Sequence, residues 1–351
     1  MARPAIAEPQ VTIVVVPREC FGYTQKALES IYANSDIPFE LVYVDAGSPA
    51  KARRYLEAEA RKRNFHLIRA DYYLSPNRAR NLGLSQVRTK YVVFIDNDVV
   101  VARNWLKPLL DCAEETGAAI VGPLTCQGEP VHEVVHCAGG ESGIVEEIKS
   151  GKIRRRIIEK IYRQGERVAN VGQQLQRQES GLAEFHCMLV RTQTFDAVGP
   201  LDEGLLNTKE HVDFCIAVIQ MGGRVYFEPA SVVTYLAQPP RSWGDIAFYM
   251  LRWSDAWELA SLYRLRDKWN LTEDDYFKNR YKNLGWRRKQ SIIKPLSRML
   301  TFGRNSKRVE EILAATDKVI NRYLTARYAW RHATIHKSPP RQVTISISEE
   351  A

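Results

Sequence analysis

Apolar runs of strand length alternate with helical stretches through the first third of the chain, and this alternation is its most restrictive feature. The first run, Val11 to Val16, is almost continuously apolar, which indicates a strand covered on both faces. Further strands are predicted over 39–44, 66–70, 91–95 and 118–121, with helices over 23–32, 50–63, 77–86 and 105–115. Such alternation is typical of a parallel sheet in an α/β domain.

The rest of the chain is expected to complete the sheet and then become helical. Strands are predicted at 188–190, 224–227 and 232–235, whereas the charged segment 144–178 is expected to be helix and loop laid over a site. Helical spacing follows at 243–265 and 309–326. Four parts are therefore expected: two sheet halves over 11–125 and 126–240, a helical region over 241–335, and a mobile tail over 336–351.

The formal charge of +9 is concentrated in two segments, Lys149 to Arg167 and Lys278 to Arg308. Such a charge fits nucleic acid, an anionic membrane surface, a polyanionic substrate or a merely solvated face. No nucleic-acid-binding motif accompanies it, so no nucleic acid is expected. Tryptophans among arginines over 243–288 leave open a helical cap on the core and peripheral contact with a membrane.

Three features of the sequence indicate the cellular compartment. No apolar run reaches the roughly 18 residues of a spanning helix, and the start of the chain carries no apolar signal segment. Six cysteines are scattered without metal or redox spacing, which favours a reducing compartment. A cytoplasmic protein, working at the inner face of the membrane if it contacts lipid, is expected.

The best candidate for chemistry is Asp96-Asn97-Asp98, which directly follows the predicted strand 91–95. Ligands of open parallel sheets gather at the carboxyl ends of the strands, and Asp45 follows another strand at the same edge. Two carboxylates one residue apart can bind one hard cation, or one can hold a ribose instead. Mg²⁺ and Mn²⁺ prefer such oxygen ligands and share them with substrate phosphates. An acidic turn at a strand end is the structural alternative.

Further motifs stand in order around this triplet. They are the loop Pro17-Arg18-Glu19 after the first strand, Asp45-Ala46-Gly47-Ser48 after the second, Ala79-Arg80-Asn81, and Tyr91 to Asp98. In this order they resemble glycosyltransferase family 2, the inverting enzymes of the GT-A fold, and the resemblance covers about residues 11–236. It implies an α/β fold with a Rossmann-like nucleotide-sugar-binding half (11–125), an acceptor-binding half (126–240) and a C-terminal helical extension.

The resemblance also implies which residues meet the donor, a UDP-, GDP- or dTDP-sugar. Asp45 and the Pro17 loop would hold the nucleotide, while Asp96 and Asp98 would hold ribose and a Mn²⁺ or Mg²⁺ ion on the diphosphate. The full donor set implied is Pro17, Arg18, Glu19, Asp45, Gly47, Ser48, Arg80, Asn81, Asp96, Asn97 and Asp98.

Glu210-His211-Val212-Asp213 resembles the family's E-D-x-D helix, in which a carboxylate acts as general base. The usual second acid is His211 here, so Glu210 or His211 is the base; Glu210 is preferred, and Asp213 is expected to be structural or acceptor-binding. A histidine that often ligates the metal is replaced by Tyr235. The metal is therefore held by the aspartates and the diphosphate alone, or is dispensable.

His132-Glu133-Val134-Val135-His136 matches the zinc-protease pattern H-E-x-x-H, but its valines and the neighbouring Pro130 favour a strand. Histidines four residues apart on a strand lie about 13 Å from each other, too far to share one zinc. One of them could still face the sugar site. His186 and Glu184, just before the predicted strand 188–190, could do so as well.

The expected function is inverting transfer of a sugar to a hydroxyl of a glycan, polysaccharide or lipid-linked acceptor. Two alternatives stay open. One is a non-catalytic scaffold of the same fold that binds nucleotides or glycans, and the other is a nucleotidyltransferase, although no Gly-rich, Lys-bearing loop follows the first strand.

Overall fold

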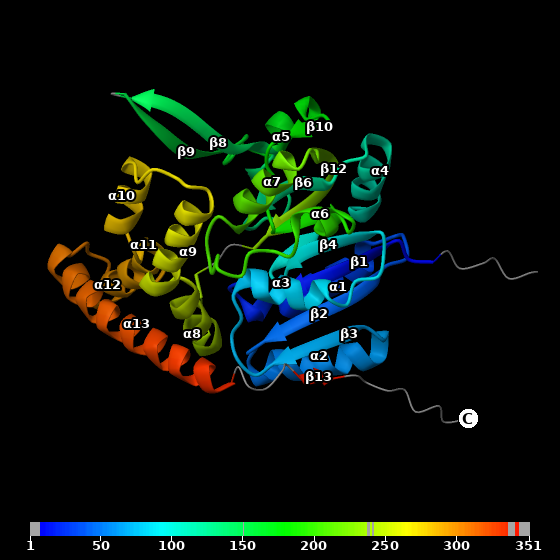
Figure 1. Ribbon diagram of the computed structural model, residues 1–351. Helices are drawn as coiled ribbons and strands as arrows, with labels where there is room; N and C mark the ends of the chain where they lie inside the picture. Colours follow the sequence, from blue (N-terminus) through cyan, green and yellow to red (C-terminus); the bar gives the residue numbers. More distant parts are fainter. Residues whose placement is uncertain (1–7, 150, 237–238, 241, 336–340, 344–351) are drawn as a thin grey trace, which may run out of the picture.

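Figure 1 shows an α/β fold with a mixed β-sheet and a helical region beside it. The computed structural model describes residues 8–149, 151–236, 239–240, 242–335 and 341–343. Four parallel strands form the first sheet half in the order β3-β2-β1-β4. Their bounds are β1 (Val11–Val16), β2 (Glu40–Ala46), β3 (His66–Ala70) and β4 (Tyr91–Asp96), and the helices between them are α1 (Thr24–Asn34), α2 (Ala50–Arg63) and α3 (Pro76–Leu84). The predicted alternation is confirmed.

Successive residues of β1 point into two separate apolar cores, one on each face of the sheet. Ile13 and Val15 pack with Leu28 of α1 on one face. Val14 and Val16 pack with Ala79 of α3 on the other. Because helices cover both faces, β1 is apolar nearly throughout, and its polar contacts are left to the loop at its carboxyl end.

The second sheet half continues from β4 with antiparallel β11 (Cys187–Arg191), then β6 (Ile120–Gln127), β12 (Val225–Tyr235) and β10 (Gln178–Ser180). The two strands predicted at 224–227 and 232–235 are one strand, β12, whose register shifts between Glu228 and Val232. Since β11 starts where β4 ends, the start of β11 and the ends of β1 and β4 share one edge. The remaining elements of this half are β5 (Val99–Val101), α4 (Leu106–Thr116), β7 (Val135–Cys137), α5 (Val168–Val171), α6 (Thr194–Val198) and α7 (Glu210–Gln220).

The expectation of helix and loop over residues 144–178 is wrong for much of its length. β8 (Gly140–Lys149) and β9 (Lys152–Ile161) form an antiparallel hairpin that extends from the body of the molecule (Figure 1). Its charges pair across the strands: Glu146 with Arg155, and Glu147 with Arg156 at 3.4 Å. Opposite charges facing each other add to the stability of paired strands, while Ile144, Ile157 and Ile161 pack the hairpin against the body of the molecule.

The boundary expected near residue 240 separates the sheet from a helical region. It contains α8 (Trp243–Arg252), α9 (Asp255–Lys268), α10 (Asp275–Lys282), α11 (Trp286–Arg288), a π-helical turn (Lys289–Ile293), α12 (Lys294–Leu300) and α13 (Lys307–Ile335). α8 lies against the carboxyl edge of the sheet, where Phe248 stacks on Tyr73 with ring centroids 4.9 Å apart. The backbone N–H of Phe21 also donates to Asp245 of α8 at 2.8 Å. Helices therefore cover the edge at which the predicted donor residues lie.

Arg288 ties the helical region together. Its buried guanidinium lies 2.9 Å from Asp255 of α9 and 2.9 Å from Asp317 of α13, and it donates to the carbonyl of Trp253. A guanidinium has five N–H donors in a fixed plane, which suits one residue for joining several elements.

The tail expected to be mobile over 336–351 contains a strand, so that expectation does not hold for all of it. β13 (Arg341–Val343) pairs antiparallel with the edge strand β3. An edge strand presents unpaired N–H and C=O groups, which an added strand satisfies. Residues 336–340 and 344–351 lie outside the described residues.

Among the helices of the described residues, none combines the length and the hydrophobicity needed to cross a bilayer. All six cysteines are buried thiols.

Candidate active site

A polar cavity of about 390 Å³ lies at the shared edge of the sheet. Its walls come from three parts of the chain: the loop after β1, the acceptor-side elements around β11 and α7, and the helical region. Of the residues predicted to form the site, Arg18, Arg80, Glu210 and His211 line it.

Asp96, at the end of β4, is surrounded by cationic and imidazole groups. Its carboxylate lies 2.8 Å from Arg18 Nη1, 3.3 Å from Arg80 Nη2 and 3.2 Å from His186 Nδ1. Burial by itself raises the pKa of Asp96, but Arg18, His186 and Arg80 outweigh it and hold this pKa below its usual range. Asp96 is therefore an anion whose charge is already neutralised by the protein.

Asn97 holds the loop after β1. Its Oδ1 accepts from the backbone N–H of Arg18 at 2.7 Å, and its Nδ2 donates to the carbonyl of Cys20 at 3.3 Å. Its own backbone N–H donates to the carbonyl of Val16 at 2.9 Å. The side chain predicted to meet the donor thus fixes the Pro17–Cys20 loop between β1 and β4.

Asp98 is buried, and neither of its carboxylate oxygens has a hydrogen-bond partner among the described residues. Burial, together with the charges of Asp96 and Glu19, raises the pKa of Asp98 well above its usual value despite the opposing charge of Arg18. A buried, unpartnered carboxylate is rare in folded proteins and indicates an unfilled need for a cation or a proton.

Glu19 also faces the helical region. Its carboxylate accepts from the indole N–H of Trp253 at 3.0 Å and lies 3.8 Å from Arg252. The loop after β1 is thereby joined to the end of α8, which no pattern in the sequence indicated.

Asp45, Gly47 and Ser48 stand at the end of β2, beside the loop after β1. Asp45 accepts from Ser48 Oγ at 2.9 Å and pairs with Arg69 of β3. Gly47 has a φ of +70°, and a Cβ there would lie 2.8 Å from the ring of Tyr73. The turn therefore requires glycine at this position.

A second cavity, of about 240 Å³, adjoins this turn. Phe21, Pro49 and Tyr55 are among its lining residues, so its walls are largely apolar and aromatic.

Arg80 and Asn81 are neighbours on α3, but their side chains contact different parts of the molecule. Arg80 is fully buried, packs 4.0 Å above the ring of Phe185, and has its pKa lowered to about 10, chiefly by burial. The side chain of Asn81 accepts from the backbone N–H of Leu201 at 3.0 Å and donates to the backbone carbonyl of Leu201 at 2.9 Å. Asn81 therefore anchors the loop before α7. The structure brings Arg80 to the cavity and leaves Asn81 away from it.

The start of α7 carries the three predicted catalytic residues. Glu210 lines the cavity, and its Oε1 is buried without a hydrogen-bond partner among the described residues. His211 also lines the cavity, with its Nε2 3.0 Å from Glu159 of β9. Burial opposes protonation of His211, but Glu159 and Glu184 outweigh it and raise its pKa.

Asp213 points elsewhere. It accepts from Lys268 Nζ at 2.7 Å and from the indole N–H of Trp269 at 2.8 Å, both at the end of α9. It joins α7 to the helical region and does not line the cavity.

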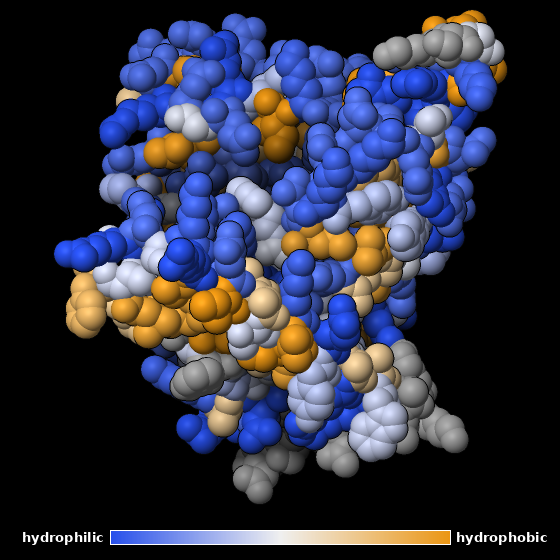
Figure 2. Space-filling model, turned by 90° about the vertical axis from the view of Figure 1, so that its left-hand side faces the viewer, coloured by the Kyte–Doolittle hydropathy of each residue, from blue (hydrophilic) through white to orange (hydrophobic). Residues whose placement is uncertain are grey.

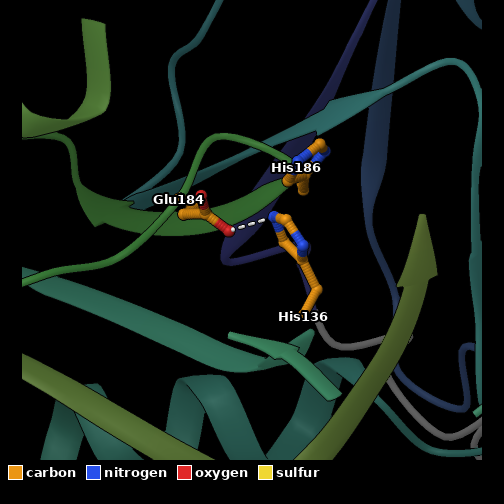
Figure 3. A group of neighbouring side chains, drawn as sticks. All are labelled: His136, Glu184 and His186. Carbon is orange, nitrogen blue, oxygen red and sulfur yellow. Dashed lines mark ion pairs between the residues drawn. The ribbon is translucent and has the colours of Figure 1, made fainter. Parts of the chain in front are cut away.

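The H-E-x-x-H segment is not helical. His132 has a φ of +64° and its backbone N–H donates to Thr234 Oγ1 at 2.7 Å, whereas His136 lies on β7, in agreement with the strand predicted there. His136 does line the cavity, as do Glu184 and His186. Figure 3 shows these three side chains together, with the ion pair of 3.0 Å between His136 Nε2 and Glu184 Oε2.

Several cavity residues had no sequence signal. Arg252, Trp253, Arg280 and Arg287 come from the helical region and Glu159 from the hairpin. The arginines come from the nucleotide half and the helical region, whereas the acids Glu159, Glu184 and Glu210 all come from the acceptor half. The cavity therefore brings several arginines and three carboxylates together, and Glu210 is close enough to Arg80 and Arg252 to interact with their charges.

Residues 12–166 match the sequence profile described as glycosyl transferase family 2. Over 227 residues the chain is 24% identical to the pre-mycofactocin glycosyltransferase of Mycobacterium tuberculosis, which covers 64% of this chain and 42% of that protein. Over 121 residues it is 32% identical to the succinoglycan biosynthesis protein ExoO of Rhizobium meliloti, covering 34% of each. The chain thus spans less than half the length of these two curated relatives.

Among solved structures, one of GalNAc-T7 with UDP, GalNAc and Mn²⁺ aligns with a TM-score of 0.49 at 14% sequence identity. The alignment covers 79% of this chain and 56% of that one.

Proposed function

We propose that this chain, whose residues 12–166 are a glycosyltransferase family 2 domain of the GT-A fold, moves a sugar from a nucleotide-diphosphate sugar to an acceptor hydroxyl with inversion. The observation that carries the proposal is that one cavity is lined both by several arginines and by a carboxylate, Glu210, with a buried oxygen that has no hydrogen-bond partner among the described residues. A diphosphate leaving group needs cations, and an attacking hydroxyl needs a base on the opposite side of the anomeric carbon.

The diphosphate is expected to bind against the arginines that line the cavity. Arg18, Arg252, Arg280 and Arg287 converge there from the loop after β1, α8, α10 and α11. Guanidinium groups bind phosphate oxygens through paired N–H donors, and negative charge grows on those oxygens as the glycosidic bond breaks. The base of the nucleotide belongs in the second cavity, where Phe21 and Tyr55 offer aromatic surfaces beside the Asp45 turn.

Of the two aspartates at the end of β4, only one is available as a metal ligand. Asp98 has two free buried oxygens, whereas Asp96 is already paired with Arg18 and Arg80. We assign Asp98 and the donor diphosphate as the holders of a Mn²⁺ or Mg²⁺ ion, which would supply charge neutralisation to the leaving group. Arg18 then leaves Asp96 and pairs with phosphate.

Glu210 acts as the base. Its Oε1 is buried in the cavity wall without a hydrogen-bond partner among the described residues, so it can accept the proton of an acceptor hydroxyl as the hydroxyl oxygen attacks the anomeric carbon. His211, paired with Glu159, binds the acceptor beside it. The relative named for succinoglycan biosynthesis favours a glycan acceptor.

A donor panel tests this function. Purified protein is mixed with UDP-, GDP- and dTDP-sugars with and without Mn²⁺, and both thermal shift and release of nucleoside diphosphate are measured. At least one donor should stabilise the protein and be hydrolysed or transferred. Stabilisation without turnover on any acceptor would support the scaffold alternative, and pyrophosphate release would support a nucleotidyltransferase.

The helical region presents a basic face with exposed apolar side chains. Residues 276–309 contain 11 Lys and Arg and no Asp or Glu. At the turn between α12 and α13, Phe302 is 97% exposed, and Met299 and Leu300 beside it are exposed as well. Figure 2 shows the side of the molecule with this region, where hydrophobic residues form a band bordered by hydrophilic ones.

We propose that this face contacts an anionic membrane surface. Apolar side chains that enter the headgroup layer, flanked by cations attracted to anionic lipids, are the usual combination for peripheral binding. A lipid-linked acceptor would then be presented to an enzyme that already lies at the membrane.

Replacing Phe302 by Ser should weaken binding to vesicles of phosphatidylcholine with phosphatidylglycerol by roughly tenfold, because one buried aromatic side chain is lost. Sedimentation with vesicles measures this, and pure phosphatidylcholine vesicles should bind poorly. Ile148→Ser, on an exposed apolar residue near the tip of the β8–β9 hairpin, is the matched control and should bind normally. If Phe302→Ser bound vesicles as well as wild type, Phe302 would not be part of the contact. If the protein preferred RNA over vesicles, the proposed membrane contact would be contradicted.

A further inference from the structure

His136, Glu184 and His186 form a cluster that the proposed transfer reaction does not use. One potential ligand atom from each side chain lies within 4.8 Å of the others. They come from β7 and from the segment before β11, so strands distant in sequence bring them together. As Figure 3 shows, His136 and Glu184 point toward each other, with His186 beside them.

The contacts within the cluster are close without being satisfied hydrogen bonds. His136 Nε2 and Glu184 Oε2 are 3.0 Å apart, yet Glu184 Oε2 and His186 Nδ1 are buried without a hydrogen-bond partner among the described residues. Two ligands of a tetrahedral zinc ion, each about 2.0–2.2 Å from it, lie roughly 3.3–3.6 Å apart. The spacing of the first pair is therefore close to that of two ligands facing a common ion.

A neighbouring amide orients one of the imidazoles. His136 Nδ1 lies 3.0 Å from Gln127 Oε1, which can only accept, so Nδ1 carries the proton. A metal ion would replace the proton that Nε2 shares with Glu184 in the ion pair, while Nδ1 keeps its proton on Gln127. Fixing the tautomer through the second ring nitrogen is what metal-ligating histidines require.

We propose that His136, Glu184 and His186 bind a transition-metal ion of the zinc class, at a site that adjoins Asp96, whose carboxylate lies 3.2 Å from His186 Nδ1. Two imidazoles and one carboxylate suit Zn²⁺ or Co²⁺, whereas Mg²⁺ prefers an all-oxygen shell. All three residues line the cavity, so the fourth position is open to it. A hydroxyl or phosphate oxygen of a substrate is the fitting ligand there. The inference needs only the geometry of this cluster and does not rest on the proposed transfer reaction.

Cobalt is the probe that separates the two sites. Chelator-treated protein titrated with Co²⁺ should bind one equivalent with visible absorption of a four- or five-coordinate nitrogen and oxygen site, and Zn²⁺ should displace it. His136→Ala and Glu184→Gln should each weaken this binding by at least the roughly 10–100-fold that loss of an outer-shell partner costs. Glu184→Gln keeps the shape of the side chain, and near-ultraviolet circular dichroism checks that each variant is folded.

Two variants serve as controls. His66→Ala removes a histidine at the start of β3, away from the cavity, and should leave the cobalt spectrum unchanged. Asp98→Asn should leave it unchanged too, even if it abolishes sugar transfer. Loss of the spectrum in Asp98→Asn, or its survival in folded His136→Ala, would overturn the proposal. X-ray absorption of the zinc-loaded wild type is independent of variants: imidazole scattering is expected, and an all-oxygen shell contradicts it.

Discussion

Asp98→Asn should lower sugar transfer by roughly 10²–10³-fold, the range found when one group that stabilises transition-state charge is removed. The amide keeps the volume of the carboxylate but loses the charge that would hold a divalent ion against the diphosphate. Asp98 is singled out because its two oxygens are buried and unpartnered, whereas Asp96 is already neutralised by Arg18 and Arg80. Steady-state transfer at saturating Mn²⁺, with Asp71→Asn on an exposed residue as control, measures the loss.

The same substitution should stabilise the donor-free protein. The pKa of Asp98 is raised in the folded state, so the folded protein holds this proton more tightly than the unfolded chain does. In the unfolded chain the pKa of Asp98 is about 3.9. As the pH rises above this pKa, ionisation of Asp98 favours the unfolded chain and lowers the stability of the fold, and lowering the pH restores that stability. Asp98→Asn should exceed wild type in melting temperature near pH 7, and the difference should shrink toward pH 4. A variant that is both fully active and no more stable would contradict the role given to Asp98.

Glu210→Gln should lower transfer by roughly 10²–10⁴-fold, because a general base contributes about that much. Glu210 has a buried oxygen free to accept a proton in the cavity wall, whereas His211 already faces Glu159 at 3.0 Å. His211→Gln should cost less and act mainly on the Michaelis constant for the acceptor. Burst and steady-state kinetics on the same acceptor distinguish the two effects.

The pH profile provides a check that does not depend on the variants. The pKa of His211 is raised, so an imidazole acting as base would be lost as the pH falls through a value above its usual 6.5. If Glu210 is the base, wild-type activity should persist through that range. A low-pH limb above 6.5 that disappears in His211→Gln would assign the base to the histidine instead. Asp213→Asn is the control, since Asp213 pairs with Lys268 and Trp269 outside the cavity; it should reduce stability more than catalysis.

Much of the fold could be read from local pattern. The alternation through the first third gave the parallel strands, because a strand buried on both faces must be apolar nearly throughout. The ordered motifs from Pro17 to Asp98 led to the family whose profile matches residues 12–166. The hairpin over 140–161 could not be read in this way, because charged residues fill much of both strands and its apolar contacts, made by Ile144, Ile157 and Ile161, are with clusters formed by distant elements.

For the site, the sequence by itself determined which residue types stand at the ends of β1, β2 and β4, since strand ends follow from apolar pattern and parallel strands end at one edge. Only the tertiary structure decided what each of them faces. It pairs Asp96 with Arg18 and leaves Asp98 free, it turns Asp213 toward α9, and it brings Arg252, Arg280 and Arg287 to the cavity from more than 150 residues away from β4. Local pattern reports which face of an element is buried, whereas ion pairing and the meeting of distant helices depend on packing between elements, which no short segment encodes.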